Sequence, residues 1–124
     1  MCINWPRRLL VVESTTLYTL MTGISADGGA MVQIRAFLFD DVNEAKLAAH
    51  GIRPEQLDQL LDEEFVAFPN RKERRGLYLV IGRDWGGMCI AAPVEATHDR
   101  YLWRPITAWP CKDSEATRLD RAMR

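Results

Sequence analysis

Lys46 and His50 stand four residues apart in the stretch EAKLAAHGI, which has the pattern of a short helix ending at Gly51. At this spacing an ammonium group and an imidazole lie on the same side of a helix, one turn apart. An imidazole titrates near neutral pH and accepts a proton, and a neighbouring cation stabilises developing negative charge. The structural alternative is that the lysine is a solvated charge and the histidine ends the helix, where the helix dipole favours it. Taken alone, the pair favours this structural interpretation.

A second concentration of charge is the segment RKERR at residues 71–75, just ahead of an expected strand that ends at Arg83. Arg104 stands in a later expected strand. Guanidinium groups bind phosphate oxygens two at a time, so these cations would hold several phosphates if the sheet brought them to one face. A solvated hairpin loop has the same composition as residues 71–75. For Arg104 the alternative is stacking on a nearby tryptophan.

Three tryptophans, Trp85, Trp103 and Trp109, fall in the expected sheet region. Exposed aromatic rings can stack on nucleic-acid bases. Packing in the core is the commoner use of tryptophan, and we expect it for Trp109.

Composition restricts the classes of function. A chain of 124 residues builds one compact domain, and its formal net charge of −1 gives no overall attraction for nucleic acid, so any such binding must rest on a local patch. No apolar run approaches the roughly 20 residues of a membrane helix. We therefore expect a cytoplasmic protein that is not inserted in a membrane.

The three cysteines, Cys2, Cys89 and Cys111, are odd in number and lack CxxC spacing. With two histidines far apart, they indicate neither a zinc site nor a disulfide framework, and we expect core or bystander thiols in a reducing compartment. The phosphate-cradling patterns GxxxxGK[ST] and GxGxxG do not occur, so the expectation is no metal and no cofactor.

The composition changes at SADGGAM, residues 25–31, where Asp27, Gly28 and Gly29 break any regular pattern. We expect residues 1–30 to be an N-terminal extension outside the main fold, poorly ordered or even the product of an upstream start codon. Residues 31–124 would form the domain. The segments RLLVVE and TTLYTLM leave open an added strand.

The patterns from residue 31 onward predict a small α+β domain. The first helix, residues 42–50, would be N-capped by Asp41 with Glu44 at its third position, and would end at Gly51. Its expected core-facing residues are Val42, Ala45 and Ala49. The second helix, 54–62, would begin at Pro54. The expected strands are 33–39, 64–69, 76–83, 88–95 and 102–109, followed by a short C-terminal helix.

From about Met31 to Glu115 the chain resembles the BrnT toxins of bacterial type II toxin–antitoxin pairs, which are small ribonucleases with a RelE-like fold. The resemblance rests on FLFDDVNEAKLAAHGIRPEQLDQLLDE, on NRKERRGLYLVIGRD, and on WRPITAW followed by a charged helix. It implies a strand, two helices, an antiparallel sheet of three to four strands and a C-terminal helix.

The resemblance also implies roles for individual residues. The catalytic residues that it implies are His50, Lys46, Arg83 and Arg104. The substrate-binding residues expected beside them are Glu55, Arg71, Arg74, Arg75 and Trp85. The reaction would be metal-free cleavage of RNA, in which the ribose 2′-hydroxyl attacks the adjacent phosphate, a histidine accepts the proton and cations stabilise the phosphoryl oxygens.

The chain departs from the family pattern at Trp109, where the family commonly carries a second arginine. Two functions therefore stay open. One is a toxin that cleaves RNA, blocks translation and is neutralised by a ribbon-helix-helix antitoxin, with a homodimer in the toxin–antitoxin complex compatible with this scheme. The other is a catalytically inactive BrnT-like module that binds a protein or RNA.

Overall fold

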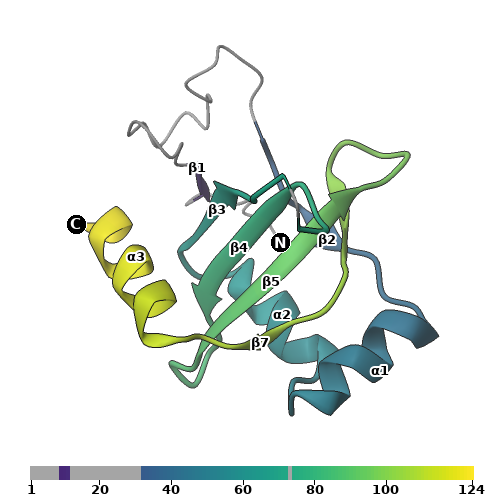
Figure 1. Ribbon diagram of the computed structural model, residues 1–124, viewed down its shortest axis with the longest axis horizontal. Coiled ribbons are helices and arrows are strands. Elements are labelled where there is room, and N and C mark those ends of the chain that lie inside the picture. Colours follow the sequence, from purple (N-terminus) through teal and green to yellow (C-terminus); the bar gives the residue numbers. More distant parts are fainter. Residues whose placement is uncertain (1–8, 12–31, 73) are drawn as a thin grey trace.

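The computed structural model describes residues 9–11, 32–72 and 74–124. Helices and strands form an α+β arrangement, in which two consecutive helices and one C-terminal helix flank a run of strands (Figure 1). The elements in chain order are β1 (Leu9–Val11), β2 (Ala36–Phe37), α1 (Asp41–Ala49), α2 (Pro54–Leu60), β3 (Phe65–Pro69), β4 (Tyr78–Arg83), β5 (Cys89–Ala96), β6 (Leu102–Pro105), β7 (Trp109–Pro110) and α3 (Asp113–Met123). In the described part of the chain, no helix is both long and apolar enough to cross a bilayer.

One sheet organises the molecule, with the strand order β1-β3-β4-β5-β6-β2. Neighbours from β3 to β6 are antiparallel, whereas β1 runs parallel to β3 and β2 runs parallel to β6. The short strand β7 pairs with β5 beside this path. In Figure 1, α2 passes behind β4 and β5, and α3 stands at the β3 side of the sheet.

The alternation of side chains along β3 shows that the sheet has a core on each face. Phe65 and Ala67 pack in one cluster with Leu57 and Leu60 of α2. Val66 and Phe68 belong to a second cluster, which contains Leu119 of α3. A strand that is buried on both faces is apolar at every position, which explains the unbroken run FVAF.

The first helix differs from its expected form by one residue at the cap. Asp40, not Asp41, is the N-cap: its carboxylate accepts a hydrogen bond from Asn43 N at 2.8 Å, and Asp40 N donates to Asn43 Oδ1 at 2.9 Å. The expected core face is wrong too, because Asn43 and Leu47 are buried while Val42 is 59% exposed. Asn43 is buried because its Nδ2 group donates to the carbonyls of Leu38 and Pro105, at 2.9 and 2.8 Å.

The expected end of the first helix and the expected start of the second are confirmed. Gly51 follows α1 with a φ of 76°, the left-handed conformation expected of it, and Pro54 is the first residue of α2. Arg53 N donates to Gln56 Oε1 at 2.9 Å at the start of α2. The corner that holds His50 is therefore set by local sequence.

Two expected strands are shorter in the structure. Strand 33–39 reduces to β2, and strand 102–109 divides into β6 and β7, because the chain leaves β6 after Pro105. There Ile106 N donates to Pro93 O at 2.8 Å, outside the β5–β6 ladder.

Within its described residues, 9–11, the N-terminal region contributes one strand. Leu9–Val11, in the segment RLLVVE, pairs parallel with β3. Part of the chain before residue 31 therefore belongs to the sheet, although we expected the domain to begin at that residue. Residues 1–8 and 12–31, on which the expected poor order of the extension falls, lie outside the described residues.

The expectation of unpaired cysteine thiols is wrong for two of the three. Cys89 and Cys111 form a disulfide, with their Cα atoms 5.3 Å apart. Cys111 N also donates to Cys89 O at 2.9 Å, so the backbone of the two residues is already in register. The spacing of 22 residues shows no recognisable motif, because the pair meets only when β7 returns to β5. Cys2 lies outside the described residues.

Candidate functional site

A cavity of about 530 Å³ opens on the face of the sheet that carries α3. Its walls come from the β3–β4 loop, from β4 and β5, from residues 106–109, and from the first turns of α3. The lining residues are Pro69, Asn70, Arg71, Arg74, Arg75, Leu79, Pro93, Ile106, Thr107, Trp109, Lys112, Ser114, Glu115 and Arg118.

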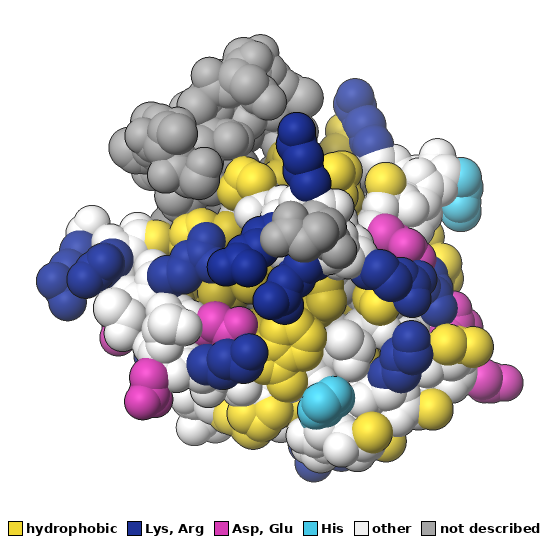
Figure 2. Space-filling view, viewed as in Figure 1, with side chains coloured by type: hydrophobic (Ala, Val, Ile, Leu, Met, Phe, Trp, Pro, Cys, Tyr) yellow, Lys and Arg dark blue, Asp and Glu magenta, His cyan; other side chains and the backbone are white. Residues whose placement is uncertain are grey.

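The rim of this cavity is basic. The β3–β4 loop contributes Arg71, Arg74 and Arg75, and the start of α3 contributes Lys112 and Arg118. Figure 2 shows Lys and Arg side chains spread across this face around hydrophobic surface. In the part of the chain that the structure describes, no ion pair includes Arg74, Arg75 or Lys112. These cations remain available to a ligand.

The loop that carries the arginines is held by hydrogen bonds from the side chain and the backbone of Asn70. Asn70 Nδ2 donates to Arg75 O at 2.9 Å, and Asn70 N donates to Leu77 O at 3.1 Å. Gly76 has a φ of 97°, and a Cβ atom there would lie 3.1 Å from Pro93 Cβ. A glycine at this position lets the loop approach β5 closely. The approach sets the loop arginines over the cavity.

The floor is apolar and includes Leu79, Pro93, Ile106 and Trp109. Trp109 packs partly buried against the cluster around Leu119. The expected use of Trp109 in packing is thus only half of its role, because the same side chain also lines the cavity. A basic rim over an apolar, aromatic floor suits a ligand that is both anionic and flat.

Among the described lining residues, one carboxylate is present, that of Glu115, and it is buried at 8% exposure. Trp109 Nε1 donates to its two oxygens at 3.0 and 3.3 Å, and Lys112 N donates to Oε1 at 2.8 Å. The Arg118 guanidinium lies 3.9 Å from the centre of the Phe68 ring. Partial burial lowers the pKa of Arg118, and the charge of Glu115 opposes that shift.

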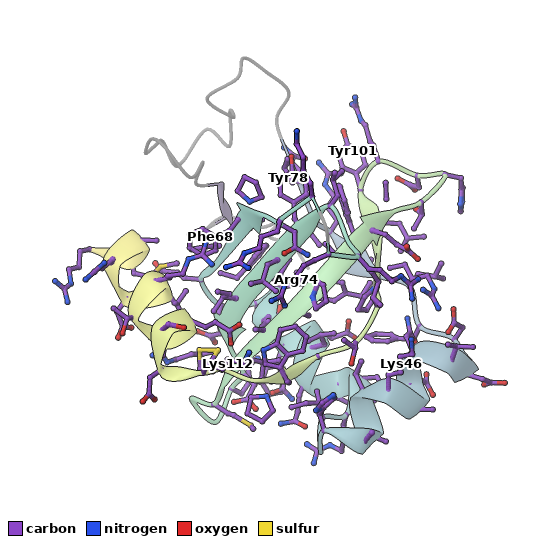
Figure 3. All side chains as sticks on the ribbon, in the orientation of Figure 1. Lys46, Phe68, Arg74, Tyr78, Tyr101 and Lys112 are labelled. Carbon is purple, nitrogen blue, oxygen red and sulfur yellow. A yellow bond between two sulfur atoms is a disulfide. The ribbon has the colours of Figure 1, made fainter. Side chains whose placement is uncertain are left out.

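Lys46 is exposed on α1, His50 is exposed at the C-cap of the same helix, and neither lines the cavity. The His50 ring meets the Trp109 ring edge-on, with centroids 6.4 Å apart, so the imidazole contacts a residue that lines the cavity. Figure 3 shows Lys46, Arg74 and Lys112 on one face of the molecule.

Arg104 makes structural contacts within the domain. Its guanidinium donates to Asp40 at 2.8 and 3.2 Å and to Glu95 at 2.9 Å, and its side chain is only 20% exposed. The hydrogen bond from Arg104 lowers the pKa of Asp40, and the bond to Asp40 raises the pKa of Arg104. This arginine links the N-cap of α1 to β5 and β6, and the two carboxylates that it contacts belong to the domain itself.

Arg83 lies at the far end of β4 from the basic loop, about 17 Å along a strand of six residues. It donates to Asp120 at 3.2 Å and lines a separate hollow with Asp62, Glu63 and Glu64. An acidic surrounding of this kind does not favour a phosphate.

Trp85 and Glu55 lie near that same end. Trp85 is 66% exposed in the turn after β4, where its backbone N–H donates to Gln59 Oε1 at 3.1 Å. Glu55, in the first turn of α2, is 4.0 Å from Arg53. Neither lines the cavity.

The structure therefore gathers the three loop arginines and leaves Arg83, Arg104, Glu55 and Trp85 elsewhere. It adds Lys112, Arg118 and Glu115, for which the sequence offered one signal, the charged C-terminal helix that begins four residues after Trp109. In the described residues, no three His, Cys, Asp or Glu side chains gather as metal ligands would.

Comparison with known proteins gives no further guide. No family model, no curated protein and no solved structure matches this chain. The resemblance to BrnT toxins rests on its sequence motifs alone.

Proposed function

We propose that the protein is a small RNA-binding module that holds its ligand in the cavity between the β3–β4 loop and α3. The observation that carries this proposal is the convergence of five described cations around an apolar floor that includes Trp109. This is the second of the two functions that the sequence left open.

The chemistry of the cavity supports a nucleic acid over a simple anion. Arginine forks and a lysine attract phosphates, and an aromatic floor adds affinity for bases. The volume of about 530 Å³ lies in the range of small-ligand sites. Because the net charge of the chain is −1, such binding depends on this cavity and not on an overall positive field.

Charge reversal at the loop tests this proposal. The affinity of the full chain for a short labelled oligouridine, measured by fluorescence anisotropy at low salt, should fall about tenfold or more in Arg74→Glu/Arg75→Glu. The matched control is Arg121→Glu/Arg124→Glu, which reverses two charges at the end of α3, outside the cavity. Equal losses in the two variants, or no binding by the unaltered protein, would refute RNA binding at the cavity.

The ribonuclease toxin remains a second candidate because His50 meets Trp109 at the cavity wall. In this scheme His50 accepts the proton of the 2′-hydroxyl and the hydroxyl oxygen bonds to phosphorus. The bond from phosphorus to the 5′-oxygen breaks, and the departing oxygen takes a proton from water. Lys46 and the rim cations would stabilise the phosphoryl oxygens. Arg83 and Arg104 are not available, since their contacts to carboxylates hold them elsewhere.

Product analysis distinguishes the two functions. Cleavage would leave a 2′,3′-cyclic phosphate and a 5′-hydroxyl, and would be lost in His50→Ala. Intact RNA after prolonged incubation with a protein that binds it would leave the binding module as the function.

The toxin candidate has a family context that we propose with it. This context consists of a RelE/BrnT-like arrangement of the fold, a cytoplasmic location and a ribbon-helix-helix antitoxin as partner. Growth arrest on induction of the full chain, relieved by co-expression of a neighbouring ribbon-helix-helix protein, would support the toxin pair. In the cytoplasm Cys89 and Cys111 would be exposed to reduction, so the RNA measurements should be made with and without reductant.

A further inference from the structure

We propose that an unpaired base of the ligand stacks on Trp109 and that Glu115 is the positioning residue that holds the indole in place. The inference rests on the proposed RNA binding and specifies its ligand class: single-stranded RNA with an accessible base, recognised through both its bases and its phosphates.

Three different contacts fix the position of Trp109. Its backbone lies opposite Ala91 in the β5–β7 pairing, which places it against the sheet. Its Nε1 group donates to Glu115 of α3. The His50 ring meets it edge-on from α1. A ring held from the sheet and from two helices loses little conformational entropy on binding a base, which is the property of a good stacking platform.

The position of Glu115 calls for an explanation, because a carboxylate beside phosphate-binding cations weakens their attraction for an anion. A buried carboxylate is also costly unless it is hydrogen-bonded. Glu115 meets that condition through Trp109 Nε1 and Lys112 N. Orienting the indole is a function that offsets the lost attraction. The bond to Lys112 N also caps α3, so the test must separate positioning from capping.

The arrangement of charge around Trp109 fits a strand that crosses the cavity. Arg74 and Arg75 approach from the β3–β4 loop, and Lys112 and Arg118 approach from α3. Figure 3 shows Arg74 and Lys112 on the same face, projecting from these two elements. Phosphates on the two sides would leave a base between them over the apolar floor. A base in a duplex is already stacked and paired, so only an unpaired base reaches such a floor.

An abasic oligonucleotide provides the decisive probe, because it keeps the phosphates and lacks the bases. The full chain should bind oligouridine about tenfold more tightly than an abasic strand of equal length, and more tightly than an RNA duplex. Trp109→Leu should reduce the affinity for oligouridine to that for the abasic strand. Trp109→Phe, which keeps an aromatic face, should retain most of the preference. Trp85→Leu is the matched control and should change neither affinity.

Glu115→Gln tests positioning, since glutamine keeps an acceptor for the α3 cap but loses the charge-assisted bond to the indole. The ratio of the oligouridine affinity to the abasic affinity should fall several-fold. A lower melting temperature with an unchanged ratio would show that Glu115 only caps the helix, and would overturn its positioning role.

The two proposals fail in distinguishable ways. If the unaltered protein binds abasic and base-bearing strands equally, or if Trp109→Leu folds and keeps the full ratio, the stacking inference is overturned while RNA binding stands. If neither strand binds, both proposals are overturned.

Discussion

At the scale of single residues, Asn43 illustrates how a polar side chain can take a core position. Helical periodicity favoured Val42 for burial, yet Val42 is exposed and Asn43 is fully buried. The amide of Asn43 donates to two carbonyls, those of Leu38 and Pro105, at the junction of α1 and β6. The need to pair buried backbone groups outweighed the apolar transfer energy of a valine.

Replacing Asn43 should therefore destabilise the domain far more than replacing its neighbour. Asn43→Ala should lower the free energy of unfolding by about 2–3 kcal/mol, because it removes the donor to the buried Pro105 carbonyl, the donor to the Leu38 carbonyl and the cap contact to Asp40. Val42→Ala should change it by less than about 0.5 kcal/mol. Urea denaturation of both variants measures the difference, and equal effects would contradict the assigned role of Asn43.

Arg104 shows the opposite relation between residue type and use. An arginine opening a strand suggested phosphate binding, but its guanidinium donates three hydrogen bonds to the carboxylates of Asp40 and Glu95. A cation held by two carboxylates has little left for an anionic ligand. Its contribution is to structure.

The Asp40–Arg104 pair should make stability depend on pH in the acid range. Because the pKa of Asp40 is lowered in the folded state, the ionised carboxylate stabilises the fold above its unfolded pKa, and this stabilisation is lost as the pH falls through the folded pKa. Asp40→Asn keeps a good cap and removes the charge. Its melting temperature should be below that of the unaltered protein at neutral pH, and the gap should narrow below about pH 4. A gap that stays constant down to low pH would exclude this linkage.

At the scale of elements, residues 106–118 decide the shape of the candidate site. This segment supplies Trp109 through β7 and Lys112, Glu115 and Arg118 through α3. It is anchored to β5 by the β7 pairing and by the Cys89–Cys111 disulfide. Leu119 of α3 packs in the apolar cluster on this face of the sheet and also holds the segment in place.

Removing the disulfide should lower the free energy of unfolding, but the domain should still fold. A bridge between cysteines separated by 22 positions corresponds to about 3 kcal/mol of unfolding free energy in the chain-entropy model. Cys89→Ser/Cys111→Ser should lose about that amount in urea denaturation, and the unaltered protein should lose the same amount under reductant. If reductant leaves the stability of the unaltered protein unchanged, the bond is not formed in solution.

At the scale of the whole molecule, charge is separated although the net charge is only −1. Cations gather at the cavity on the α3 face, and carboxylates gather with Arg83 in the other hollow. Binding of a polyanion should therefore be local and sensitive to salt.

The salt dependence of RNA affinity can be given a magnitude. If four of the five cavity cations contact phosphates, the logarithm of the association constant should fall with the logarithm of salt concentration with a slope of about −3. Lys112→Gln should reduce the magnitude of that slope by about 0.7. Arg121→Gln, outside the cavity, should leave it unchanged. A slope near zero for the unaltered protein would contradict a phosphate-binding site.

Sequence alone determined the local features: the corner at Gly51, the start of α2 at Pro54, and the buried strands β3, β4 and β5. These follow from capping, turn conformation and side-chain periodicity, which act over a few residues. The basic loop at residues 71–75 was also recognisable, because a run of like charges is visible in one dimension.

Only the tertiary structure decided which of these residues meet. The length of β4 separates Arg83 from the loop, Arg104 finds Asp40 at a separation of 64 residues, and Trp109 comes to the cavity through the return of β7 to β5. Such contacts depend on strand register and on the paths of connections between elements. Both are set by the packing of the entire core, so no local pattern of residues reveals them.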